Sequence, residues 1–375
     1  MENKDLLVIL KESPLFNLSL SSKELFHSNF LWWLGSNERT FPLFKQVMER
    51  FVGMALQWTF DNISVEREKK HIDLCVRNKA NEKPLLILEN KVKSIPNKEQ
   101  LKEYYEKEPK AENYVLLSLA TEFLDKAAIE NISENGNKKW KICSYADFAE
   151  ALKTIPDGLT QYKYECELIN DYRTFILSLH ELAQLWIGNV KSDNLFKEEK
   201  SDKIEECRLH DLYDKLRYSQ LALMLQKRLN RTDVFVKTGY SNKLGIVEVT
   251  IPYEDHQLII QVQGNSYRHA YVYVGEDEGQ DWRDCLWKRI LKEDKVVREI
   301  NFLSSKEADF GSDKLFKDGI YPITNSKKGK QYNAFVGKND VFIYQSRQFR
   351  PDTTIGELLE NICNEVESIC EIIKQ

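Results

Sequence analysis

The feature that most constrains this chain is a short apolar run, Leu85–Leu88, followed directly by Glu89-Asn90-Lys91. Four consecutive large aliphatic residues are typical of a central strand that is covered on both faces. Such a strand needs helices packed on both sides of its sheet. The sequence therefore predicts a layered α/β core in which charged residues stand where a buried strand ends.

The spacing of apolar residues divides the first half of the chain into elements. Helical spacing, with Ser21-Ser22 as a candidate cap, predicts helices at residues 4–12, 21–35, 41–56, 98–108, 148–152 and 162–186. Strand spacing predicts strands at Ile63–Lys69, His71–Arg77, Pro84–Val92, Tyr114–Leu119 and Trp140–Cys143. This order favours an α/β fold with a mixed central sheet flanked by helices.

The length of 375 residues favours two domains over one very large domain. We place the boundary in Lys191–Glu206, where ten of sixteen residues are charged, although this stretch could equally be the solvated start of the next helix. The predicted domains are residues 1–190 and 207–375.

The second domain is predicted to be α+β, with an antiparallel sheet. Its expected strands are Val234–Tyr240, Leu244–Ile251, Gln257–Val262 and Ala270–Val274, with a later hairpin of Tyr332–Val336 and Val341–Tyr344. Its expected helices are residues 209–229, 284–301 and 355–373. Nothing in this half assigns a role, so substrate selection, sensing and assembly all stay open.

Composition limits the location and the partners. The seven cysteines are scattered without a Cys-x-x-Cys pair and are interpreted as reduced thiols. No apolar run approaches the ~18 residues of a membrane span, and the start lacks the apolar stretch of a signal peptide, so we expect a cytoplasmic protein with no membrane partner. The net charge of −5 argues against a globally basic nucleic-acid coat but leaves room for a local basic groove.

The charged strand end forms a candidate metal site. If the second and third strands form a hairpin centred near Asn81, residues whose numbers sum to 162 face each other, and Asp73 lies opposite Glu89. Like charges that close are destabilising unless a cation lies between them. Strand periodicity places Lys91 on the same face as Glu89. Carboxylate oxygens suit Mg²⁺ or Mn²⁺, although a surface hairpin with an ordinary Glu-x-Lys would show the same spacing.

These motifs resemble the PD-(D/E)XK nuclease superfamily, in particular its subgroup with an Ile/Leu-Glu-Asn-Lys strand and a Gln-x-x-x-Tyr helix. The matching segments here are Ile72-Asp73, Leu88-Glu89-Asn90-Lys91, Gln100–Tyr104 and the helix that contains Glu24–Leu31. The resemblance covers about residues 5–186 and implies a restriction-endonuclease-like core. Ile72 stands where the family often has proline.

The resemblance also implies roles for individual residues. Asp73 and Glu89 would be metal ligands, Lys91 the catalytic lysine, and Glu24 an additional ligand of the metal or its water. Gln100 and Tyr104, one helical turn apart, would face the substrate or support the site. Beyond the site, Lys93 and Lys102 could follow a phosphate backbone, with a solvated lysine-rich surface as the alternative.

The resulting hypothesis is a metal-dependent nuclease, with DNA favoured over RNA as the substrate and endonucleolytic cleavage favoured. The resemblance suggests bacterial restriction or anti-phage defence, and a homodimer is conceivable. The alternatives are an RNA nuclease and a non-catalytic module that binds nucleic acid or protein and retains the nuclease fold.

Overall fold

The computed structural model describes residues 3–19, 24–69, 71–92, 98–123, 139–187, 202–300, 302–303, 332–350 and 352–375. The chain divides into two compact units, Met1–Gly188 with Lys200–Leu216 and Asn189–Glu199 with Arg217–Gln375. Most of the boundary expected at 191–206 falls on residues 188–201, outside the described part. Within the described residues the division lies between Leu216 and Arg217, in the helix α10 (His210–Leu229).

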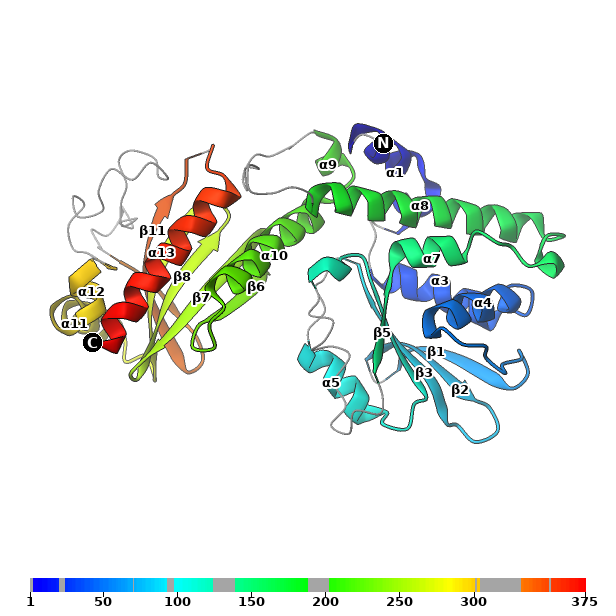
Figure 1. Ribbon diagram of the computed structural model, residues 1–375, viewed down its shortest axis with the longest axis horizontal. Coiled ribbons are helices and arrows are strands. Elements are labelled where there is room, and N and C mark those ends of the chain that lie inside the picture. Colours follow the sequence, from blue (N-terminus) through cyan, green and yellow to red (C-terminus); the bar gives the residue numbers. More distant parts are fainter. Residues whose placement is uncertain are drawn as a thin grey trace. The chain divides into compact units, whose positions relative to one another are not determined.

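The first unit is built on a five-stranded mixed sheet, which confirms the expected α/β core (Figure 1). The strands lie side by side in chain order, antiparallel from β1 to β3 and parallel from β3 to β5. Their bounds are β1 (Ile63–Lys69), β2 (Ile72–Asn78), β3 (Pro84–Lys91), β4 (Asn113–Ser118) and β5 (Trp140–Ser144). Because three strands are parallel, the carboxyl ends of β3, β4 and β5 meet at one edge.

Helices cover both faces of this sheet, as the apolar run of β3 requires. Figure 1 shows α3 (Glu24–Ser36), α4 (Phe41–Val52) and α7 (Tyr145–Ala151) on one side and α5 (Lys98–Lys107) on the other. All eight residues of β3 are buried. The other helices in the described part of the unit are α1 (Asn3–Glu12), α2 (Pro14–Leu18), η1 (Thr121–Phe123), η2 (Asp157–Leu159), α8 (Lys163–Ile187) and α9 (Asp202–Glu206).

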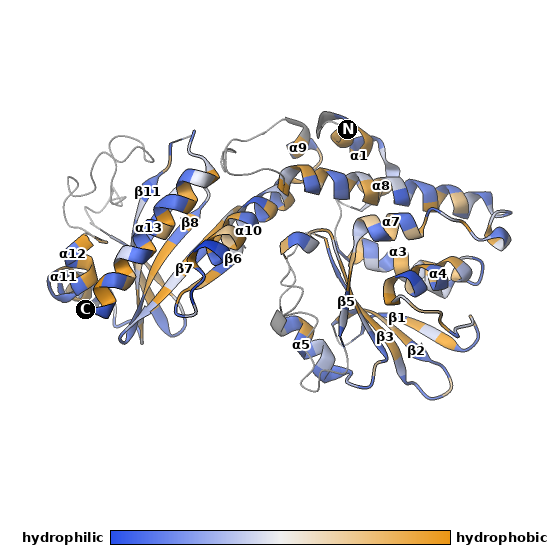
Figure 2. Ribbon diagram, in the orientation of Figure 1, coloured by the Kyte–Doolittle hydropathy of each residue, from blue (hydrophilic) through white to orange (hydrophobic). Residues whose placement is uncertain are grey.

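From Leu86 onward, the apolar residues of β3 alternate between two cores. Leu86 and Leu88 join the large core beneath α3, α4 and α7, whereas Ile87 joins a smaller core with Leu101 and Tyr104 of α5. In Figure 2 most of α5 carries the hydrophilic colour, while the strands carry the hydrophobic one. The α5 side is therefore the thinner and more polar cover of the sheet.

Two expected elements differ at their ends. The helix expected to reach residue 56 stops at Val52, because Gly53 takes a left-handed φ of 71° and its N–H bonds the carbonyl of Glu49 at 2.8 Å. The strand expected from His71 begins at Ile72, because His71 has a φ of 64° in the preceding turn. The candidate cap Ser21-Ser22 lies outside the described residues.

The second unit contains a six-stranded antiparallel sheet, as expected for its α+β class. The strand order is β10-β11-β9-β8-β7-β6, so the late hairpin joins the main sheet through β11 and β9. The bounds are β6 (Phe235–Ser241), β7 (Leu244–Tyr253), β8 (His256–Gln263), β9 (Ser266–Val274), β10 (Asn333–Val336), β11 (Asp340–Gln348), α11 (Gln280–Glu293), α12 (Lys295–Ile300) and α13 (Ile355–Lys374).

The helix expected at 284–301 is two helices. Asp294 has an extended ψ of 123°, which ends α11, and its carboxylate accepts the N–H of Val297 at 2.9 Å. An Asp side chain that bonds an amide in the first turn is an N-cap, and it starts α12. None of the helices in the described parts of the chain has the length and apolarity needed to cross a lipid bilayer.

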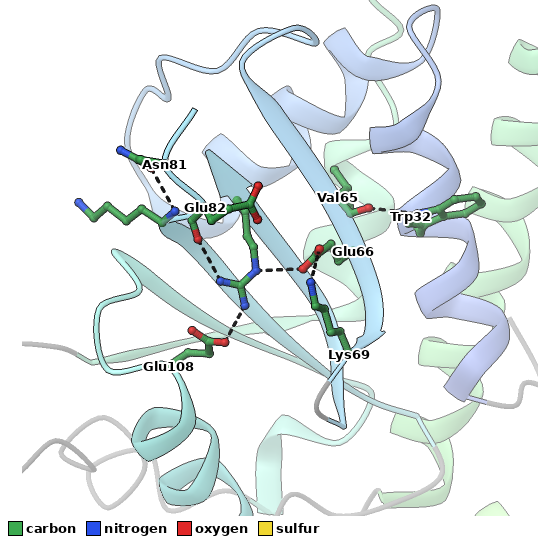
Figure 3. A network of polar contacts seen from close by, with 9 residues as sticks. Trp32, Val65, Glu66, Lys69, Asn81, Glu82 and Glu108 are labelled. Atoms are coloured by element: carbon green, nitrogen blue, oxygen red, sulfur yellow. Dashed lines mark hydrogen bonds and ion pairs between the residues drawn. The ribbon is translucent and has the colours of Figure 1, made fainter. Parts of the chain in front are cut away.

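A buried arginine ties α5 to the antiparallel edge of the first sheet. The Arg77 guanidinium lies 2.9 Å from Glu66 of β1 and 2.6 Å from Glu108, the residue after α5, and it donates to the Glu82 carbonyl at 3.2 Å. Figure 3 shows Glu66, Glu82 and Glu108 gathered around this one group. The hydroxyl of Tyr114 donates to the Glu108 carbonyl at 2.6 Å, so the end of α5 is held twice.

We expect Arg77→Ala to lower the free energy of unfolding of the first unit by about 3–5 kcal/mol, because the buried Glu108 carboxylate loses its cation. Urea unfolding measures this loss. The matched control is Lys83→Ala, since Lys83 pairs with Glu112 at 2.7 Å but both side chains are 47% exposed. The control should cost at most about 1 kcal/mol. Equal losses in the two variants would contradict a structural role for the Arg77 pair.

Candidate metal and active site

The end of β3 divides its polar side chains between the two faces of the sheet. Glu89 and Lys91 share the parity of Ile87 and lie on the α5 side, whereas Asn90 lies on the α3 side. Glu89 is 1% exposed and Lys91 8%. Charged groups this buried are costly unless other groups compensate them.

The β2–β3 register is the one predicted from the hairpin. The observed pairs Leu74↔Leu88, Cys75↔Ile87 and Val76↔Leu86 all sum to 162, and a shift occurs only after Val76. Asp73 follows next along this ladder, and its Oδ2 accepts the backbone N–H of Asn90 at 2.7 Å. This bond fixes the Asp73 carboxylate beside the residue that follows Glu89.

The two oxygens of Glu89 have opposite surroundings. Oε1 lies 2.6 Å from the Lys91 ammonium and accepts bonds from Gln100 Nε2 at 3.1 Å and the Tyr104 hydroxyl at 3.4 Å. Oε2 is buried and has no hydrogen-bond partner. A buried oxygen without a partner costs about 1–3 kcal/mol. Such an oxygen, beside a second carboxylate, is suited to a cation.

Burial above all raises the pKa values of both acids, although Lys91 lies beside them. Burial, and then the charge of Asp73, raises the pKa of Glu89 to about 8. Burial also raises the pKa of Asp73 to about 6. Burial lowers the pKa of Lys91, but the charge of Glu89 outweighs it and the net shift is upward. The lysine therefore stays charged, and the two carboxyls resist joint ionisation in the absence of a cation.

Glu24 reaches the same place from the start of α3. Its Oε1 accepts the N–H of Val92 at 3.2 Å, and its carbonyl accepts the side-chain amide of Asn90 at 3.0 Å. The structure thus brings Glu24 to the end of β3, next to Lys91. Since one oxygen of its carboxylate already bonds the backbone, its role toward the metal stays a proposal.

Residues 15–173 match the family model of the PD-(D/E)XK nuclease superfamily. This region belongs to that superfamily. The PD-(D/E)XK region includes α3, the whole first sheet and α5, so it contains every residue of the cluster described above. No curated protein and no solved structure matches the chain significantly.

Of the two remaining predicted residues, the structure describes Lys102 alone. Lys93 lies outside the described residues. Lys102 lies about 200° around α5 from Gln100, which turns it away from the sheet. Its side chain is 52% exposed, and its ammonium lies 3.9 Å from Glu106. Lys102 is therefore on the outer surface of α5.

The sequence analysis assigned no role to the side chain of Asn90 or to its partners Ser28 and Tyr145. The Asn90 side chain is fully buried and bonds Tyr145 and Ser28 as well as Glu24. Strand parity could have shown that Asn90 faces the core. Its partner Tyr145, 55 residues away in the sequence, leaves no local signal.

A second group of possible ligands lies at the β7–β8 turn of the other unit, at Glu254, Asp255 and His256. Both acids are exposed, and the His256 ring already contacts Asp255 at 3.3 Å and Asp294 at 3.2 Å. This group is separate from the predicted site and has no buried carboxylate oxygen that lacks a partner.

We expect Mn²⁺ binding, measured by calorimetry, to tighten as the pH rises. The metal must displace a proton from Glu89 below its pKa of about 8, and Asp73 adds a second proton near 6. When the pH is lowered below each pKa, the affinity for Mn²⁺ should fall by about tenfold per pH unit for each proton that the metal displaces.

In the same titration Asp73→Asn should abolish binding. Glu103→Gln is the control, because Glu103 is an exposed α5 carboxylate paired with Lys107 at 3.7 Å. If Mn²⁺ affinity does not depend on pH, or if Asp73→Asn still binds Mn²⁺, then Asp73 and Glu89 are not the metal ligands.

Proposed function

We propose that this protein is a metal-dependent nuclease that hydrolyses phosphodiester bonds of DNA as an endonuclease. One observation carries the proposal: the unpartnered Oε2 of Glu89 lies buried on the sheet face that also holds Asp73 and Lys91. Membership of residues 15–173 in a nuclease superfamily supports the same reaction class.

Asp73 and Glu89 would hold Mg²⁺ or Mn²⁺, and both offer the carboxylate oxygens that these ions prefer. A bound divalent ion supplies Lewis acidity toward the phosphate and lowers the pKa of a coordinated water. Nucleases of this superfamily depend on divalent metal ions. The site offers what such an ion needs, because the only unpaired carboxylate oxygen of Glu89 is already desolvated.

Lys91 supplies the positive charge that the reaction needs. Its ammonium stays protonated beside Glu89, and it can stabilise the negative charge that develops on the phosphate oxygens. Gln100 and Tyr104 bond only Oε1 of Glu89, so they orient the carboxylate and leave Oε2 for the metal. The backbone N–H of Asn90 orients Asp73 in the same way.

The finer assignments rest on the superfamily alone. These are DNA as the substrate, endonucleolytic cleavage, and a setting in bacterial restriction or anti-phage defence. We also propose that the second unit selects the substrate or senses a signal. The cytoplasmic location and the homodimer stay predictions.

Lys91→Met should reduce cleavage by at least about 10²-fold, because the transition state loses the positive charge that the protein itself supplies. The measurement is nicking and linearisation of circular DNA in Mg²⁺, Mn²⁺ or chelator, with single-stranded RNA assayed in parallel. Lys83→Met, an exposed lysine on the same unit, should cleave like the wild type.

Cleavage that persists in chelator or in Lys91→Met would refute the assigned site. If the protein cleaves RNA in preference to DNA, the proposed nuclease activity stands and DNA is not its substrate. Absence of both cleavage and Mn²⁺ binding would favour the non-catalytic module.

Lys102→Ala should weaken substrate binding without changing kcat, because the exposed ammonium can reach phosphate only outside the site. The slope of log affinity against log salt should fall by about one. Lys153→Ala is the control, since Lys153 follows α7 on the other side of the sheet and pairs with Glu150 at 3.5 Å. Identical salt slopes for the two variants would remove Lys102 from the substrate path.

A further inference from the structure

A chain of buried polar groups lies behind the proposed metal site, on the α3 side of β3. Its centre is Asn90, whose side chain is fully buried. Its amide nitrogen donates to the Glu24 carbonyl at 3.0 Å and to Ser28 Oγ at 3.4 Å, and its oxygen accepts the Tyr145 hydroxyl at 2.5 Å. Both ends of the buried amide therefore have hydrogen-bond partners inside the core.

Tyr145 brings a third element to this chain. It is the first residue of α7, directly after β5, and it is fully buried. Its ring packs edge-on against His27 of α3 at 5.3 Å. A hydroxyl in such a place needs a partner, and Asn90 provides it. Through two side chains, α7 and α3 are thus linked to one residue of β3.

Glu24 joins α3 to the end of β3 by two hydrogen bonds. Its backbone carbonyl accepts from the Asn90 side chain, while its own carboxylate accepts from the Val92 backbone at 3.2 Å. The first turn of α3 and the last residues of β3 are therefore joined by two bonds that flank Lys91. The backbone N–H of the same Asn90 holds Asp73 at 2.7 Å.

We infer that Asn90 and Tyr145 are positioning residues for the metal site. They hold the end of β3 against α3 and α7, so that Asp73, Glu24 and the Glu89–Lys91 pair keep one arrangement. The inference rests on the proposed function, because it assigns this buried chain to the same metal site. It adds residues on the opposite face of the sheet, which touch neither metal nor substrate.

The core contains a natural comparison for this role. Tyr172 of α8 is also fully buried, and its hydroxyl bonds His27 Nδ1 at 2.8 Å. This bond joins α8 to α3 and does not reach β3. Tyr145 and Tyr172 therefore differ in what their hydroxyls hold, while each contributes one buried hydrogen bond.

The test compares Tyr145→Phe with Tyr172→Phe in the full chain, each of which removes one oxygen atom. Both variants should remain folded, with similar drops in the unfolding midpoint. Mn²⁺ affinity by calorimetry should fall about tenfold in Tyr145→Phe, as for groups that support metal ligands, and stay within about twofold of the wild type in Tyr172→Phe. The kcat for DNA cleavage should follow the same order.

Two outcomes would contradict the inference, and they can be distinguished from each other. If the wild type binds Mn²⁺ and both variants bind it equally well, or are weakened equally, the positioning role is overturned and the proposed function stands. If the wild type itself neither binds Mn²⁺ nor cleaves nucleic acid, the proposed function fails and this inference fails with it.

Discussion

The burial of Glu89 and Lys91 at the end of an apolar strand is the constraint on which the site depends. An ion pair at 2.6 Å with exposures of 1% and 8% loses most of its hydration. The Coulombic attraction offsets that cost only when further hydrogen bonds satisfy the remaining groups. Gln100 and Tyr104 provide these bonds to one oxygen. The other oxygen, Oε2 of Glu89, is buried without a hydrogen-bond partner. This difference between the two oxygens favours a bound cation over a purely structural salt bridge.

Side chains with different roles lie on the two opposite faces of β3. The α5 face holds the residues of the proposed metal site, and Arg77 and Tyr114 fix the far end of α5 through Glu108. The α3 face carries Asn90 and the bonds that fix the backbone. Because successive side chains of a strand point to opposite faces, one three-residue sequence can serve both. This arrangement lets the reacting groups be polar without interrupting the large core.

Local sequence patterns predicted much of the fold of both units. The apolar run identified the central strand, and the hairpin arithmetic gave the observed pairing of Leu74 with Leu88. What local patterns could not show were interactions between distant residues and single backbone angles. The Tyr145–Asn90 bond and the pairing of β11 with β9 join segments far apart in sequence. The end of α4 depends on the left-handed conformation of Gly53, which apolar spacing does not encode. Lys102 lies on the outer surface of α5, because two residues along a helix separate it from Gln100 by about 200°.

The most direct measurement is X-ray diffraction from crystals soaked in Mn²⁺, with an anomalous difference map. We expect a peak in bonding contact with Asp73 and with Oε2 of Glu89, while Gln100, Tyr104 and Lys91 keep their contacts with Oε1. An empty position there, in crystals that take up Mn²⁺ at the Glu254–His256 turn instead, would contradict a metal site at the end of β3 and with it the proposed nuclease.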